Sequence, residues 1–164
     1  MLRLRNAFLL IAVVVCLSQI AVSQTNSQYE LVKLVSERKK LMFDMQSAYL
    51  SLLAIRQGRS ADLASAADHA RSINEKIGMF VELLAPETAT GQMPNSRAKP
   101  EIWAEPKEFS VAVEALRTTS AVLLETANTG DLDAFAEQFD AFTKACLGCH
   151  DLKPSSAGRF RSAK

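Results

Sequence analysis

Two cysteines and a histidine lie within five residues near the C-terminal end of this chain of 164 residues. They are Cys146, Cys149 and His150, in the pattern C-x-x-C-H. This pattern is the attachment signature of c-type haem, in which both sulfur atoms bond to the porphyrin and the histidine ligates the iron. On a helix, residues three and four apart share a face, so one porphyrin can reach all three side chains. The motif therefore predicts one covalently bound haem c.

Zinc binding and thiol redox chemistry are the two other uses of such a cysteine pair. A structural zinc site needs four ligands, but His69 is the only other histidine. It lies beside the apolar stripe of its predicted helix, where we expect a surface position. A redox-active pair normally lies at a helix N-terminus, where the dipole stabilises the thiolate, whereas this pair follows a long helical segment. We therefore favour haem attachment over a CxxC thiol-redox or zinc-binding helical protein.

The N-terminus has the composition of a secretory signal peptide. Arg3 and Arg5 precede an apolar run, and Ala21 and Ser23 are small residues at the positions that signal peptidase reads. We expect cleavage after Ser23, which predicts a periplasmic protein. If the segment stayed uncleaved it would act as a membrane anchor, although its apolar run is shorter than the ~20 residues of a spanning helix. Residues 1–23 are thus assigned to the signal peptide and residues 24–164 to the functional domain.

Removing the signal peptide leaves a nearly neutral chain. Lys plus Arg falls from 19 to 17 while Asp plus Glu stays at 18, so the net charge is about −1. A neutral chain without a basic run argues against nucleic acid as a partner. Export also implies an oxidising compartment, in which a lone cysteine pair forms a disulfide or attaches a cofactor.

Four amphipathic helices are predicted from apolar residues spaced three and four apart. Ser60 and Asp131 are expected N-caps, and Gly58 is the expected stop of the first helix. Residues 24–28 form a polar leader that we expect to be frayed, and prolines and glycines make residues 85–105 a long crossover. The chain is therefore predicted to be all-α, an up-down four-helix bundle with one long crossover. The helices span about residues 29–57, 61–84, 106–129 and 131–149.

The two cysteines continue the apolar stripe of the last predicted helix. This places the haem on the inner face of the bundle instead of on a solvated tail. The residues of the stripe, spaced three and four apart, are Leu132, Phe135, Phe139, Phe142, Cys146 and Cys149.

Three residues outside the motif are candidates for contact with the haem. Arg38 interrupts the core stripe of the first helix, where a guanidinium needs an anion. It either meets a haem propionate, reaches the rim of the bundle or pairs with a carboxylate. Met42, one turn further on, either packs in the core or approaches the iron as a thioether ligand. Trp103 is the only tryptophan, and it either plugs the crossover against the bundle or packs on the porphyrin edge.

These features together resemble a class II cytochrome c, of the cytochrome c prime family. The resemblance covers about residues 31–150 and rests on three separated motifs. They are Arg38 followed by Met42, the segment Arg97-Ala98-Lys99-Pro100-Glu101-Ile102-Trp103, and Gly130-Asp131-Leu132-Asp133 leading to the C-x-x-C-H run.

The resemblance implies a role for each site residue. Cys146 and Cys149 form the thioether links and His150 is the proximal iron ligand. Arg38, with Lys39, lies on the propionate side, and Met42 faces the sixth coordination site. Family members are commonly homodimers through the first two helices.

The chain departs from the family pattern just after the histidine. The family usually has an aromatic residue and an arginine three and four positions beyond it, where this chain has Lys153 and Pro154. A Phe160-Arg161 pair occurs further on. It could reach back to the histidine only by a loop.

The expected function is that of a periplasmic c-type cytochrome that transfers single electrons, binds NO or CO, or does both. With Met42 unligated, the iron is five-coordinate and open to a gas. With Met42 as axial ligand, the iron is six-coordinate and low-spin, and the protein is an electron carrier only. We expect no enzymatic activity, because no arrangement of nucleophile and base is visible. The redox partner is not identified by the sequence.

Overall fold

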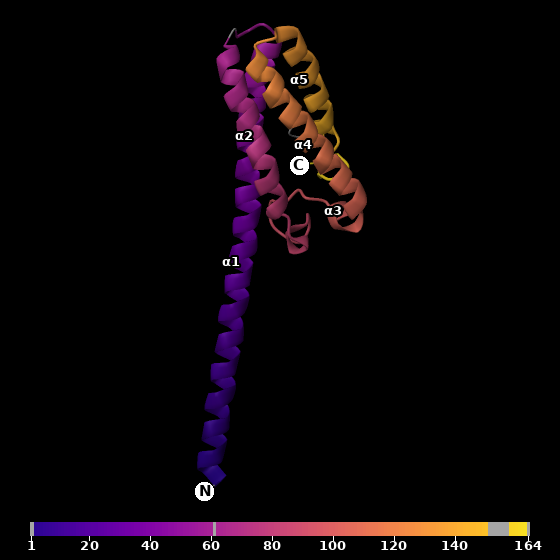
Figure 1. Cartoon of the computed structure of the whole chain (residues 1–164). Helices are drawn as coiled ribbons and strands as arrows, with labels where there is room; N and C mark the ends of the chain where they lie inside the picture. The colour runs from indigo at the N-terminus through magenta and orange to yellow at the C-terminus, as the bar shows by residue number, and fades with distance from the viewer. Residues whose placement is uncertain (1, 61, 151–157, 164) are drawn as a thin grey trace.

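The first helix is much longer than the sequence pattern predicts. A computed structural model describes residues 2–60, 62–150 and 158–163, with side chains from residue 27 onward except that of residue 63. In it, α1 spans Leu2–Arg56 (Figure 1). No glycine or proline precedes Gly58, so nothing interrupts the helix. The predicted start near residue 29 and the predicted fraying of residues 24–28 are therefore wrong. Gly58 ends α1 as predicted, with a φ of 67°.

The second helix, α2, spans Leu63–Glu82 and begins slightly later than predicted. Its N-cap is Asp62, whose carboxylate accepts a hydrogen bond from the Ser65 amide at 3.1 Å. Ser60, the predicted cap, instead accepts a hydrogen bond from the Asp62 amide through its hydroxyl. Two capping residues lie within three positions here, and the carboxylate takes the cap because it accepts more strongly than a hydroxyl.

The crossover runs from residue 83 to residue 105 and contains two short helical turns. These are the 3₁₀ turn η1 (Pro86–Thr88) and α3 (Glu101–Ala104). The sequence predicted only irregular structure there, because short turns that begin at or just after a proline leave no periodic pattern. The crossover buries Thr88, Ala89, Met93, Ser96, Ala98 and Ile102.

The last two helices carry the C-x-x-C-H motif to one end of the bundle. Helix α4 spans Pro106–Thr129 and ends at Gly130, with a φ of 77°. Asp131 then caps α5 (Leu132–Leu147) as predicted, accepting from the amides of residues 133 and 134 at 3.0 Å each. Helix α5 ends before the predicted residue 149.

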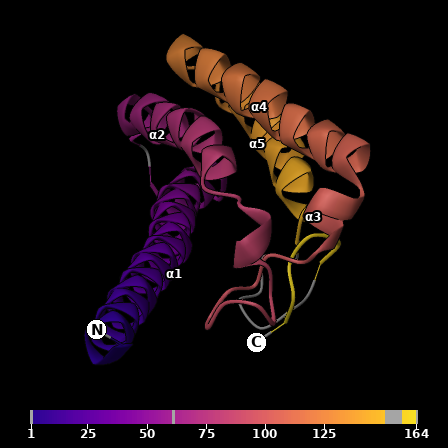
Figure 2. The same ribbon diagram turned by 90° about the horizontal axis from the view of Figure 1, so that it is seen from below.

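The four long helices form a closed ring in which α1 contacts α2 and α5, and α4 contacts the same two helices (Figure 2). Their shared core includes Phe135, Phe139 and Phe142 of α5, each at most 2% exposed. Tyr49 of α1 stacks on Phe139 with ring centroids 5.1 Å apart. Burial of each phenylalanine contributes about 1.5–3 kcal/mol. Leu132, predicted to begin the stripe, is instead 54% exposed. The predicted four-helix bundle with a long crossover is confirmed.

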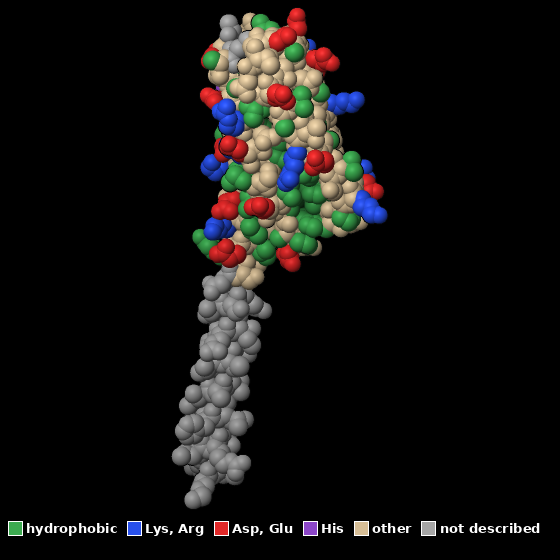
Figure 3. Space-filling model, viewed as in Figure 1, with side chains coloured by type: hydrophobic (Ala, Val, Ile, Leu, Met, Phe, Trp, Pro, Cys, Tyr) green, Lys and Arg blue, Asp and Glu red, His purple; other side chains and the backbone are tan. Residues whose placement is uncertain are grey.

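The surface of the bundle carries both signs of charge. In the view of Figure 3, Lys and Arg side chains are interspersed with Asp and Glu, in keeping with the balanced composition. Within the part of the chain that the structure describes, no helix has the length and apolarity needed to cross a membrane.

Candidate haem attachment site

The C-x-x-C-H motif forms the C-terminal end of α5 and the turn that follows it. Cys146 lies in the last turn of the helix, which ends at Leu147. Beyond that point the Cys149 amide donates to the Cys146 carbonyl at 3.3 Å, and the His150 amide donates to the same oxygen at 3.5 Å. The backbone therefore keeps a helical sense for a few residues beyond the end of α5.

The two thiols lie between the two hydrophobic clusters of the molecule. Cys146 packs against the bundle core, the main cluster. Cys149 packs against a second cluster, centred on Ala98, Ile102 and Phe160. Both residues are free cysteines, each half-buried. The motif therefore has apolar neighbours from both clusters.

Burial makes both cysteines poor thiolates. It raises the pKa of Cys146 to about 12, with a smaller contribution from the neighbouring Cys149. Burial likewise raises the pKa of Cys149. A redox-active or zinc-binding cysteine needs the opposite shift, because the thiolate is the reactive and ligating form. In the described ranges, no group of three or more His, Cys, Asp or Glu side chains is placed to hold a metal ion. His69 is half-buried on α2.

Met42 and Trp103 each pack against one of the two clusters that the cysteines contact. Met42 of α1 is partly buried against the main cluster, as is Cys146. Trp103 of α3 is partly buried against the second cluster, as is Cys149. The structure thus brings one predicted haem contact to each cluster, although iron ligation by Met42 and porphyrin packing by Trp103 stay predictions.

Arg38 is buried, but its hydrogen-bond partners belong to the crossover. Only 5% of the residue is exposed, so it does not reach the rim of the bundle. Its guanidinium donates to the hydroxyls of Thr88 and Ser96 at 2.9 Å each. It also donates to the carbonyls of Leu83 at 3.3 Å and Thr88 at 3.4 Å. These partners are neutral oxygens, and burial lowers the pKa of Arg38.

Lys39 does not share these surroundings. The residue is exposed on α1, whereas its neighbour Arg38 is buried. The structure therefore separates the two cations that the sequence grouped on the propionate side. A propionate contact for either one stays a prediction.

Comparison with known proteins gives the family. A family model described as cytochrome C′ matches residues 33–152. The chain belongs to the cytochrome c′ family. No curated protein matches the chain. Membership in the family implies haem c as the cofactor.

Solved structures of cytochrome c′ share the fold of this chain. A ferrous variant of cytochrome c prime from Alcaligenes xylosoxidans with bound NO is 21% identical, with a TM-score of 0.68 over 82% of this chain and 97% of that chain. A carbon monoxide-bound variant from the same organism is 20% identical, with a TM-score of 0.67 over 80% of this chain and 96% of that chain. Cytochrome c′ from Rubrivivax gelatinosus is 19% identical, with a TM-score of 0.65 over 79% of this chain and 94% of that chain.

The described residues fit the cofactor that the cytochrome c′ family carries. Two unbridged thiols lie three positions apart and face the two hydrophobic clusters. The histidine that follows them adjoins the same turn. Such donors suit thioether attachment of an apolar ring with one axial imidazole.

The C-terminal segment supplies residues whose role the sequence did not reveal. Phe160, 3% exposed, lies in the second cluster with Cys149. Arg161 pairs through its backbone with Ala98 of the crossover, and burial together with Arg97 lowers its pKa. The predicted departure at residues 153 and 154 lies outside the described residues. Phe160 of the Phe160-Arg161 pair nevertheless does return to the motif, since its amide donates to the Cys149 carbonyl at 3.1 Å.

Proposed function

We propose that this protein is a periplasmic cytochrome c′ that holds one haem c on Cys146, Cys149 and His150. We further propose that it binds NO or CO at a five-coordinate iron and transfers single electrons. The observation that carries the proposal is the placement of two unbridged, half-buried thiols between the two hydrophobic clusters, directly before a histidine. Export after removal of residues 1–23 is part of the proposal.

The chain's own residues divide the work of holding the cofactor. The two cysteine sulfurs would form the covalent links, and the His150 imidazole would ligate the iron. The main cluster and the second cluster would exclude water from the bound haem, which would strengthen polar contacts made there. When bound, haem c supplies an iron that changes oxidation state by one electron and can take a diatomic gas.

Gas binding is supported by the relatives and by the position of Met42. Two of the cytochrome c prime structures that share this fold contain NO and CO, respectively. Met42 contacts the main cluster, as does Cys146, so its flexible thioether would lie near a haem attached at that cysteine. Crowding without ligation leaves the sixth position for a small ligand. Ligation by sulfur would instead give a six-coordinate electron carrier with a raised potential.

The spectrum of the purified ferric protein tests this proposal. We expect a covalently retained Soret band after acid-acetone extraction and a high-spin spectrum that Met42→Ala leaves high-spin. Met79→Ala is the matched control, because Met79 is 54% exposed on α2. A low-spin spectrum that turns high-spin only in Met42→Ala would establish the six-coordinate alternative. A colourless protein would favour the thiol-redox or zinc-binding alternative.

The exposed apolar side chains of α1 support a homodimer. Phe43 and Leu50 are 70% and 53% exposed, and Tyr29 and Val32 on the same stripe are 67% and 48% exposed. Met79 is exposed on the neighbouring α2. Such a stripe on a surface helix favours association. We propose a homodimer through α1 and α2, and no enzymatic role.

A further inference from the structure

One residue near the C-terminus links the haem motif to the crossover. The Phe160 amide donates to the Cys149 carbonyl at 3.1 Å, and the Phe160 carbonyl accepts from the Lys99 amide at 3.1 Å. Its two backbone groups therefore join segments that are distant in the sequence. Figure 2 shows the C-terminal segment and the crossover at the same end of the bundle.

The side chain of Phe160 anchors this link. Its ring is buried in the second cluster and meets Phe109 of α4 edge-to-face, with centroids 5.2 Å apart. Arg159 covers the ring at 5.3 Å and forms an ion pair with Glu105 at 2.8 Å. The Phe160 ring is thus fixed by contacts with α4, with the crossover and with Arg159.

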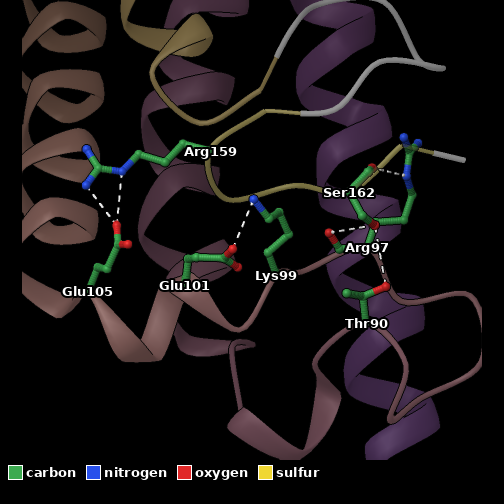
Figure 4. Close-up of polar contacts among 7 residues, drawn as sticks. All are labelled: Thr90, Arg97, Lys99, Glu101, Glu105, Arg159 and Ser162. Atoms are coloured by element: carbon green, nitrogen blue, oxygen red, sulfur yellow. Dashed lines mark hydrogen bonds and ion pairs between the residues drawn. The ribbon is translucent and has the colours of Figure 1, made fainter.

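Further backbone pairing extends the link along the crossover. Ala98 and Arg161 form an antiparallel bridge. The Ser162 amide donates to the Arg97 carbonyl at 2.9 Å, and the Arg97 Nε donates back to the Ser162 carbonyl at 3.0 Å (Figure 4). The Gly158 amide donates to the Arg161 carbonyl at 2.7 Å and closes a turn. Residues 158–162 therefore form an ordered unit, here called the C-terminal strap.

The strap passes directly over the backbone of the histidine. A Cβ atom added to Gly158 would collide with the His150 Cα, and it would lie 2.5 Å from the Cys149 carbonyl oxygen and 2.9 Å from the His150 nitrogen. All three are backbone atoms, which cannot move aside as a flexible side chain can. Only glycine permits this close approach.

His150 gains a restraint here that α5 does not provide. The helix ends at Leu147, and the amide of His150 reaches the Cys146 carbonyl only at 3.5 Å, the outer limit of a hydrogen bond. A metal ligand beyond the end of a helix needs supporting contacts to keep its orientation. The strap contacts the histidine at Gly158 and its neighbour Cys149 at Phe160.

We propose that the C-terminal strap positions His150 for the iron, with Gly158 and Phe160 as its positioning residues. The inference rests on the proposed function, since it takes His150 to be the proximal ligand. It assigns a role to a segment that the motif itself does not contain.

Amide hydrogen exchange of the full-length, haem-loaded protein tests the proposal. We expect Phe160→Ala to speed exchange at Cys149 and His150 at least ~10-fold relative to amides in the middle of α5. The iron–histidine stretching band of the ferrous protein should shift in the same variant, and Phe160→Leu should restore most of both signals. Phe135→Ala is the matched control, because Phe135 is equally buried but lies in the main cluster.

A second pair of variants covers the case in which Phe160→Ala fails to fold. Gly158→Ala should displace the strap and shift the iron–histidine band, whereas Gly78→Ala should not. Gly78 has open space around the position of an added Cβ. Unchanged exchange and an unchanged band in Gly158→Ala would overturn the proposal. Equal effects of Phe135→Ala and Phe160→Ala on exchange at His150 would also overturn it.

The failure of the strap can be separated from the failure of the proposed function. If the wild-type protein lacks a covalent haem band, the proposed function fails. The exchange measurement on that protein still decides whether the strap holds His150. If the covalent haem band is present and exchange at His150 is unaffected by both strap variants, only the strap proposal fails.

Discussion

Replacement of Arg38 by methionine should loosen the crossover. Methionine keeps most of the aliphatic length of arginine but removes the guanidinium. The two 2.9 Å bonds to Thr88 and Ser96 are charge-assisted, and such bonds contribute about 1.5–3 kcal/mol each. Removing the desolvation cost of a buried cation offsets part of that sum. We therefore expect Arg38→Met to lower the free energy of unfolding by about 2–4 kcal/mol.

Urea unfolding of the haem-loaded protein measures this loss as a shift of the midpoint. Arg56→Met is the matched control, because the Arg56 guanidinium pairs with Asp140 at the surface at 2.9 Å. An exposed pair contributes about 1 kcal/mol or less. The double variant Arg38→Met with Thr88→Val should cost less than the two single changes together, since they share one hydrogen bond.

Two results would refute this reasoning about Arg38. The first is an Arg38→Met variant no less stable than Arg56→Met. The second is strict additivity with Thr88→Val, which would mean that the guanidinium and the hydroxyl do not act on each other. Either result would remove Arg38 as the residue that holds the crossover on α1.

Three further predictions concern the thiols, the surface of α1 and the cap of α5. Because burial raises the pKa of Cys146 to about 12, the unfolded thiol of the haem-free chain ionises before the folded one, and the free energy of unfolding should decrease as the pH rises from about 9 toward 12. Cys146→Ala should flatten this part of a pH series of urea midpoints. Phe43→Glu should convert the proposed dimer into a monomer in sedimentation velocity, whereas Val111→Glu, at a residue 71% exposed on α4, should not. A dimer that survives Phe43→Glu would contradict the proposed interface. Asp131→Ala should cost about 1 kcal/mol in thermal unfolding, as loss of an N-cap usually does, and a melting temperature equal to that of the wild type would show that the cap is not needed.

Local signals predicted most of the helical framework. Apolar spacing located α2, α4 and α5 to within a few residues, and Gly58 and Asp131 end α1 and cap α5 as predicted. The helix boundaries were predicted wrongly where two capping residues compete or where no residue marks the start of a helix. Asp62 displaced Ser60 as the cap of α2, and no residue in the first part of α1 stops the helix.

The partners of Arg38 could not be predicted from the sequence. Its hydrogen-bond acceptors lie in the crossover, between residues 83 and 96. That segment has no periodicity, so nothing in the sequence shows which of its oxygens face α1. In place of the carboxylate or the rim of the bundle, the crossover offers neutral hydroxyls and carbonyls, while the propionate contact stays a prediction. Their number compensates for their lack of charge.

The residues alone predicted covalent haem attachment and most of the inward faces of the helices. Cys146, Cys149 and His150 lie within five residues of the chain, so their spacing alone predicts haem attachment. The surroundings of these residues emerged only in the fold: the partial burial of both cysteines, and the strap that crosses His150 at Gly158. The two kinds of information differ in the distance along the chain over which they act. Spacing and periodicity act over a few residues, whereas burial and backbone contact depend on how irregular segments close across the whole bundle.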